Sequence, residues 1–117
     1  MANGSSNYLA LRGKVLATIA LLKSPGGSEH WARSLEGYVL EANGDMSVLA
    51  DRVLGNYGSM GALNDFNFAE DESRNAEFNT LIAEMAELGA PFVTNDRVKH
   101  NATWRGSIAR KLAEHEA

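Results

Sequence analysis

The apolar residues of this chain recur at helical spacing along most of its length. Between about residues 7 and 22 they lie three and four positions apart, and a Ser-Pro-Gly-Gly sequence follows. This spacing puts them on one face of an amphipathic helix, which the proline and glycines then end. The same pattern recurs in residues 29–42, 46–53 and 73–88, and each segment is therefore predicted to be helical.

Capping residues support the ends of these segments. Ser28 and Asp45 precede two of the predicted helices, and residues 71–73 offer caps for the helix that follows them. Side-chain oxygens of this kind accept hydrogen bonds from the first N–H groups of a helix. Gly55 and Gly89 follow two of the segments as C-terminal residues. The segments are thus predicted to be separate helices with short connections.

A fifth helix is predicted near the C-terminus. Trp104, Ile108 and Leu112 are four residues apart, and they are expected to form its buried stripe. Asn101 or Thr103 is expected to cap its first turn.

The fold class follows from these segments. Apolar and polar residues do not alternate, as they would in a half-buried β-strand, over more than a few residues, so the chain is expected to be all-α. Short connections favour a compact bundle or orthogonal array of about five helices. At 117 residues the chain is predicted to form a single helical domain over residues 1–117. Residues 1–6 are expected to be frayed, and residues 91–117 to form a C-terminal extension with the terminal helix.

Residues 55–68 do not fit the helical pattern. They carry glycine at positions 55, 58 and 61, and then Asn64 and Asp65 between large apolar side chains. Glycines before a helix can hold a phosphate, but here no strand precedes them and no lysine follows. The preferred interpretation is a glycine-rich joint between the third and fourth helices, in which Asn64 and Asp65 bond backbone groups. The joint is expected to dock the fourth helix onto the helix that contains Trp31.

The charge distribution narrows the classes of partner. The net charge is −4, which disfavours binding to nucleic acid. Residues 64–90 contain seven acidic residues against Arg74 alone, so the fourth helix is expected to present an acidic face. A basic C-terminal tail around Trp104 leaves a nucleic-acid contact as a minor alternative.

Cysteine content and hydropathy bear on location. Cysteine is absent, which excludes disulfides and thiolate metal sites and fits a reducing cytoplasm best. The apolar run at residues 15–22 is far shorter than the roughly 20 residues that a membrane-spanning helix needs. No membrane association is expected, and the predicted location is cytoplasmic.

Residues with catalytic or metal-binding chemistry are few. His30, His100 and His115 lack the i, i+4 spacing that places two metal ligands on one helix face. Neither a metal site nor a cofactor is therefore expected. One enzymatic alternative pairs Asp65 with His30 as acid and base, which requires the two side chains to lie within hydrogen-bond reach.

Two short stretches carry a family resemblance. Residues 29–36 read Glu-His-Trp-Ala-Arg-Ser-Leu-Glu, and residues 58–65 read Gly-Ser-Met-Gly-Ala-Leu-Asn-Asp. Together they resemble an uncharacterised family of small bacterial proteins with a His-Trp helix and a G-G-M-G-S-[FL]-N-D core before a long helix. This sequence has Ser59 where the family pattern has glycine, and Ala62 where it has serine. The resemblance covers about residues 12–89 and implies an all-helical bacterial fold, with no assigned activity.

Two functional hypotheses follow, and the first is preferred. In the first, the chain is a non-enzymatic protein-interaction module of the immunity or regulatory type, whose acidic helical face binds another protein with a basic surface. In the second, the loop of residues 58–65 binds a small ligand or nucleotide beside Trp31. The candidate partner- or ligand-binding residues are His30, Trp31, Gly58, Gly61, Asn64, Asp65, Glu70, Asp71 and Glu72.

Overall fold

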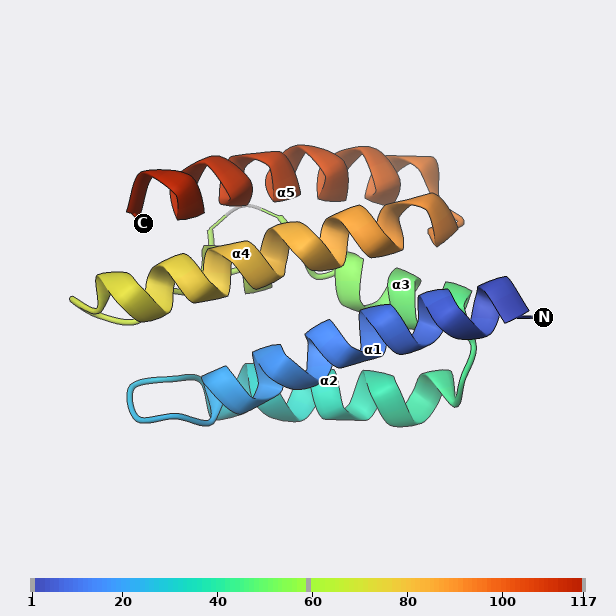
Figure 1. Cartoon of the computed structure of the whole chain (residues 1–117), viewed down its shortest axis with the longest axis horizontal. Helices are drawn as coiled ribbons and strands as arrows, with labels where there is room; N and C mark the ends of the chain where they lie inside the picture. Colours follow the sequence, from blue (N-terminus) through green and yellow to red (C-terminus); the bar gives the residue numbers. More distant parts are fainter. Residues whose placement is uncertain (1, 59, 117) are drawn as a thin grey trace.

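The computed structural model describes residues 2–58 and 60–116, and helices dominate this part of the chain (Figure 1). The α-helices are α1 (Ala2–Leu22), α2 (Glu29–Ala42), α3 (Met46–Leu54), α4 (Glu72–Gly89) and α5 (Asp96–Glu116). Two short 3-10 helices, η1 (Leu63–Asp65) and η2 (Ala90–Phe92), lie in the connections. Within the described ranges the chain has no strand, and the predicted all-α fold with about five helices is confirmed.

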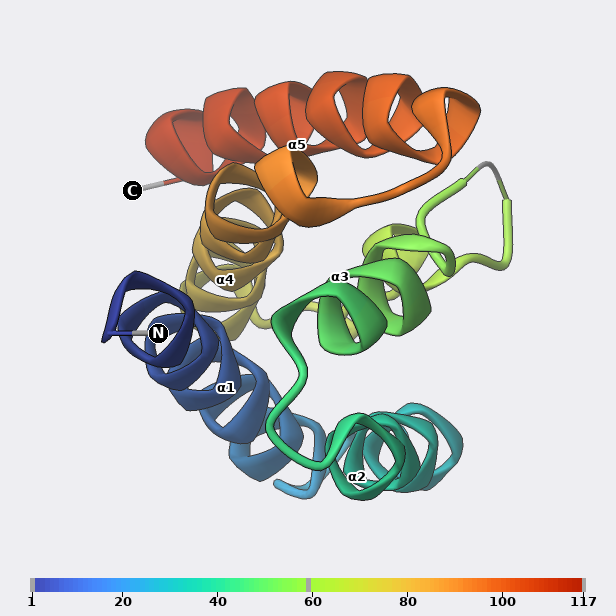
Figure 2. The same ribbon diagram turned by 90° about the vertical axis from the view of Figure 1, so that its right-hand side faces the viewer.

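Helix α4 lies at the centre of the arrangement. In Figure 1, α5 runs along one side of α4 and α1 along the other, and α2 lies beyond α1. Figure 2 shows α3 beside α4, between α5 and α2, where it closes the remaining side of the core. The expectation that α4 docks onto α2, the helix that contains Trp31, is wrong, because α1 lies between them and packs against both.

The core draws large side chains from four of the helices and from the connection between α3 and α4. Burying each of these side chains stabilises the fold by about 1.5–3 kcal/mol. The largest fully buried side chains are Phe68, Phe78, Leu11, Leu22, Leu35, Leu49, Leu54, Leu63, Ile82, Met85, Val15 and Val53. None of these residues belongs to α5.

The predicted caps of α2, α3 and α4 are confirmed. The Ser28 hydroxyl accepts the Trp31 N–H at 3.2 Å, and the Asp45 carboxylate accepts the N–H groups of Ser47 and Val48. Asp71 caps α4 in the same way, through the Arg74 N–H at 2.9 Å. Local hydrogen bonds that the sequence predicts therefore fix where these three helices begin.

The two longest helices begin earlier than the sequence predicts. Helix α1 starts at Ala2 rather than near residue 7, because each residue added to an existing helix gains a hydrogen bond and residues 2–6 contain no proline. The predicted fraying of Met1 lies outside the described residues. Helix α5 starts at Asp96, since the Asn95 side chain accepts the N–H groups of Arg97 and Val98 and caps it there.

Helix α5 packs against α4 through small residues, which corrects the predicted buried stripe. Ala102, Ala109 and Ala113 are buried at positions that share one face of the helix with Gly106. A Cβ placed on Gly106 would lie 2.5 Å from the Ala86 Cβ, so the two helices approach as closely as their backbones allow. Trp104, Ile108 and Leu112 are consequently turned outward, with 53%, 36% and 47% of their surface exposed.

We predict opposite effects for alanine at two helical glycines. Gly106→Ala should lower the free energy of unfolding by about 1–2 kcal/mol, because the overpacking cost exceeds the gain in helix propensity. Gly13→Ala should raise it by about 0.5–1 kcal/mol, because a Cβ there meets no atom within 4 Å. Chemical denaturation of the two variants measures both values. Stabilisation by both substitutions would contradict the close approach of α5 to α4.

Candidate functional site

The connection between α3 and α4 holds most of the predicted site residues. Asn64 and Gly58 are joined by two hydrogen bonds. The Asn64 side chain accepts the Gly58 N–H at 2.7 Å and donates to the Gly58 carbonyl at 3.0 Å. One amide thus satisfies both backbone groups of a residue six positions earlier. The side chain serves the backbone and is not free to hold a ligand.

Gly61 and Asp65 form a second link within the same connection. The Asp65 carboxylate accepts the Gly61 N–H at 2.9 Å. Gly61 has a φ of +87°, a left-handed conformation that glycine adopts without steric cost. This arrangement agrees with the expectation that Asn64 and Asp65 bond backbone groups, and among the described residues no lysine or arginine takes part in these bonds.

The C-terminal part of the connection is fixed by aromatic packing and a second asparagine. Phe66, Phe68 and Phe78 pack edge to face, with ring centroids 5.2–6.3 Å apart. Asn75 accepts the Phe68 N–H at 2.6 Å and donates to the Phe68 carbonyl at 2.8 Å. This repeats the arrangement of Asn64 around Gly58. The repetition identifies both asparagines as braces of irregular backbone.

Arg74 connects the start of α4 to the loop between α1 and α2. Its guanidinium lies 4.4 Å above the Phe68 ring and donates to Asp71 at 2.7 Å. It also donates to the Ser24 hydroxyl at 2.7 Å and to the Pro25 carbonyl. The Arg74 N–H and then its guanidinium hold the pKa of Asp71 below the ordinary value. Asp71 is thus engaged within the fold, unlike its neighbours in the sequence.

Glu70 and Glu72 flank this cap and remain exposed. Glu70 has a φ of +56°, which is uncommon for a residue with a side chain. In the part of the chain that the structure covers, neither carboxylate forms an ion pair. Of the acids further along α4, Glu77 is likewise exposed without an ion pair in the described ranges, whereas Glu84 pairs with Lys14 and Glu87 with Arg110.

His30 and Trp31 lie on the first turn of α2, apart from the connection. The exposed His30 ring packs edge-on against the half-buried Trp31 ring, with centroids 5.1 Å apart. No hydrogen bond joins His30 to Asp65 in the described ranges, so the geometry required by the enzymatic alternative is not present. No cluster of three His, Asp or Glu side chains suited to a metal ion occurs in those ranges either.

The first of two hollows lies beside Asn64 and Asp65, with a volume of about 420 Å³. Its lining consists of Asn64, Asp65, Phe66, Asn67, Asn75, Asn79 and Leu112. No residue of α2 takes part, so Trp31 does not border this hollow as the ligand hypothesis expects. Its polar lining includes both bracing asparagines, whose amides are already engaged.

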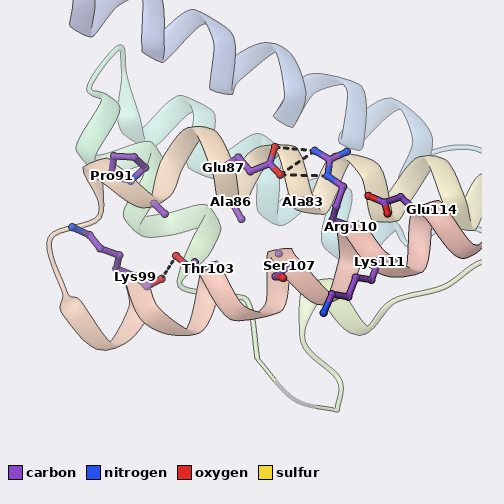
Figure 3. A pocket seen from close by; sticks show the side chains of 12 residues that line it. Ala83, Ala86, Glu87, Pro91, Lys99, Thr103, Ser107, Arg110, Lys111 and Glu114 are labelled. Carbon is purple, nitrogen blue, oxygen red and sulfur yellow. Dashed lines mark hydrogen bonds and ion pairs between the residues drawn. The ribbon is translucent and has the colours of Figure 1, made fainter.

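The second hollow is a groove of about 650 Å³ along the seam of α4 and α5 (Figure 3). Ala83 and Ala86 of α4 line it and Pro91 lies toward one end, while the ion pair between Glu87 and Arg110 crosses from one helix to the other. Lys99, Lys111 and Glu114 complete the charged rim, so cations and acids nearly balance. The groove therefore has no charge preference that would select an occupant.

The sequence pattern indicates the basic tail around Trp104 but not the outward orientation of the apolar residues of α5. Arg105 stacks on Trp104, with its guanidinium 4.3 Å from the ring centroid. The sequence does contain a signal for this orientation. Ala102, Gly106, Ala109 and Ala113 form a second stripe at helical spacing, made entirely of small residues.

No protein-family model, curated protein or solved structure matches this chain. No helix in the described ranges combines the length and apolarity needed to cross a membrane.

We predict that removing the Asn64 amide destabilises the fold. Asn64→Ala should lower the free energy of unfolding by about 1–3 kcal/mol, because two backbone groups lose their partner. Asn67→Ala is the matched control, since Asn67 is exposed on the same hollow and should change stability by less than about 0.5 kcal/mol. Equal stability of the two variants in chemical denaturation would refute the bracing role.

We predict that the protein loses stability at alkaline pH because of Tyr57. Burial raises the pKa of Tyr57 well above its ordinary value of 10.0, and its hydroxyl donates to the Ile82 carbonyl at 2.6 Å. The folded protein therefore holds the phenolic proton more tightly than the unfolded chain. Stability should be complete below pH 10 and fall above it, by at most about 1.4 kcal/mol per pH unit from this group.

Denaturation of the wild type and of Tyr57→Phe between pH 8 and about 11 tests this assignment. The variant should lose the alkaline decline that Tyr57 causes. Tyr8→Phe, which removes a hydroxyl elsewhere, should keep it. An unchanged decline in Tyr57→Phe would show that the pH dependence has another source.

Proposed function

We propose that this protein is a non-enzymatic interaction module that binds a basic surface of another protein through the acidic turn, defined as Glu70, Asp71 and Glu72. The proposal rests on one observation: Glu70 and Glu72 are exposed without an ion pair in the described ranges, as is Glu77 one turn further along, while Glu84 and Glu87 are paired. The unpaired acids of α4 therefore lie in its N-terminal half and in the residues just before it. A role of the immunity or regulatory type, and membership of the bacterial His-Trp family, are part of this proposal.

The conformation of Glu70 supports the same surface. A left-handed conformation costs a residue with a side chain about 1–2 kcal/mol, a cost that glycine avoids. Strained positions of this kind concentrate at functional sites, because function can retain a residue that stability disfavours. A glutamate in this conformation fits a carboxylate used for binding.

Complementary charge explains how such a surface works. Carboxylates at an exposed turn attract a basic partner from a distance and speed the encounter, and the effect weakens as salt screens it. Asp71 contributes mainly by holding the turn, since Arg74 already engages its carboxylate.

The small-ligand alternative has weaker support. The hollow beside Asn64 and Asp65 has the volume for a small molecule, but its two bracing amides are engaged and Trp31 does not line it. Protection from thermal unfolding by a nucleotide or metabolite would favour this alternative.

We predict that two substitutions in the acidic turn separate stability from binding. Glu70→Gly should raise the free energy of unfolding by up to about 1 kcal/mol, because it removes the left-handed strain. The double variant Glu70→Gly/Glu72→Gln should nevertheless capture less partner from a bacterial lysate at low salt. Quantitative affinity capture and chemical denaturation of the same samples provide both measurements.

Asp96→Asn is the matched control, because Asp96 is an exposed acid without an ion pair in the described ranges, and it follows the C-terminal end of α4, about 25 Å along the helix from the acidic turn. Its capture of the partner should equal that of the wild type. If no stoichiometric partner is captured, or if the double variant captures it equally well, the acidic turn is not the binding surface.

A further inference from the structure

The outer face of α5 is an apolar stripe that no other helix covers. Trp104, Ile108 and Leu112 lie in successive turns, and about half of the Trp104 and Leu112 surface is exposed. The stripe spans about 12 Å along the helix axis. The other exposed large apolar residues, Leu9, Leu16, Leu40 and Met60, do not form such a series on successive turns.

Basic residues border most of this stripe, and Asp65, in the connection between α3 and α4, lies beside its Leu112 end. Successive residues of an α-helix are 100° apart around its axis. Viewed along the axis of α5, the sector of its surface that extends from His100 to Arg105 contains the apolar stripe together with Arg97 and Lys111. His115 falls in the same sector, and none of its residues is an aspartate or glutamate. The face therefore combines apolar area with positive charge.

Arg105 is held ready for a carboxylate. Its guanidinium stacks on the Trp104 ring at 4.3 Å, which fixes its position, and no ion pair engages it among the described residues. Its buried Nε has no hydrogen-bond partner in the same ranges. The side chain as a whole is half-buried, so the donors that a partner's carboxylate can reach are the other N–H groups of the guanidinium. Tryptophan and arginine are also the residues most enriched where binding energy concentrates.

We propose that this outer face of α5, defined by Trp104, Arg105, Ile108 and Leu112, binds an amphipathic helix of a partner protein that carries carboxylates beside its apolar residues. Side chains at i, i+4 and i+8 match the spacing at which one helix meets another. A carboxylate of the partner pairs with Arg105, and its apolar residues cover the stripe. This inference does not rest on the proposed function, because it concerns a different helix and the opposite charge.

The charges disfavour two other occupants. A second copy of α5, placed antiparallel about Ile108, would bring Arg105 opposite Lys111 of the other copy, and like charges repel. A single-stranded nucleic acid would find one aromatic ring for stacking, but Ile108 and Leu112 offer it none. The net charge of −4 would also repel a polyanion.

At its Leu112 end the stripe meets the hollow that contains Asp65. The carboxylates of a bound helix should therefore lie toward Arg105 and away from Asp65. The partner helix is therefore expected to lie along α5 in one direction, with its carboxylates at the Arg105 end.

The test uses a synthetic helical peptide of about 18 residues, or five turns, with leucine on one face and glutamate beside it. A second peptide has lysine in place of glutamate, and a third has the acidic sequence scrambled. Each peptide is titrated into the isotopically labelled full-length protein, and backbone and indole N–H resonances are followed by nuclear magnetic resonance. The two tryptophans give an internal comparison, because Trp104 lies on the proposed face and Trp31 on α2.

The acidic peptide should shift the Trp104 indole and the amides of α5 and leave the Trp31 indole unchanged. Trp104→Ala and Arg105→Gln should each weaken its binding at least about tenfold, the loss expected at such anchor residues. Leu40→Ala and Arg33→Gln are matched controls on α2, where Leu40 and Arg33 are exposed, and they should bind as the wild type does. The Glu70→Gly/Glu72→Gln variant should also bind normally, which separates this test from that of the acidic turn.

Four results would overturn the inference. The first two are equal affinity of the protein for the acidic and lysine peptides, and undiminished binding of the acidic peptide by the Trp104 and Arg105 variants. The other two are resonance shifts confined to helices other than α5, and no binding of the acidic peptide at all. Self-association of the wild type that Trp104→Ala abolishes would assign the face to a second copy. Binding of single-stranded oligonucleotide that Arg105→Gln abolishes would assign it to nucleic acid.

Discussion

The close approach of α5 to α4 at Gly106 determines how the C-terminal part of the molecule is presented. A glycine on α5 lies against Ala83 and Ala86 of α4, and no larger residue fits at this point. Dispersion contacts along a tightly packed seam are individually small and collectively large. The seam therefore fixes the rotation of α5 about its own axis. That rotation turns Trp104, Ile108 and Leu112 toward solvent and the alanines inward.

The same constraint gives the molecule two surfaces of opposite character. Helix α5 carries five Lys or Arg residues against three Asp or Glu, while the chain as a whole has a net charge of −4. The acidic excess therefore lies in the rest of the molecule and includes the acidic turn at the start of α4. A small protein with an acidic surface and a basic, apolar surface is suited to contact two different partners, or two regions of one partner. This arrangement is the physical basis for the two proposals.

The connection between α3 and α4 has a different role from the one its composition first suggests. Asn64 and Asn75 each satisfy the backbone N–H and carbonyl of a residue six or seven positions earlier. Arg74 links the start of α4 to the loop before α2. Irregular backbone in a fold needs such partners, because unpaired polar groups are costly once buried. Asparagine and arginine side chains supply them here. The polar residues of this connection stabilise the fold, whereas the exposed acids beside Asp71 form no ion pair in the described ranges.

Much of the fold could be predicted from local features of the sequence. Ser28, Asp45 and Asp71 mark helix starts because capping depends only on neighbouring residues. The bonding of backbone by Asn64 and Asp65 was predictable for the same reason. The orientation of α5 was not, because the helix contains both a large apolar stripe and a small one. The stripe of small residues is the buried one because α4 presents alanines at the contact. The periodicity of α5 carries no information about the surface of α4. Asn95 was likewise missed as the cap of α5, since the apolar stripe placed the helix start further along.

The fluorescence of Trp104 tests the orientation of α5 most directly. In a Trp31→Phe variant, Trp104 is the one remaining tryptophan. Because about half of Trp104 is exposed, its fluorescence emission in the dilute folded protein should lie near the long wavelength of tryptophan in water. Acrylamide should quench this fluorescence efficiently. Emission at short wavelength with protection from acrylamide would show that Trp104 is buried, and would contradict both the packing of α5 through Gly106 and the binding face built on it.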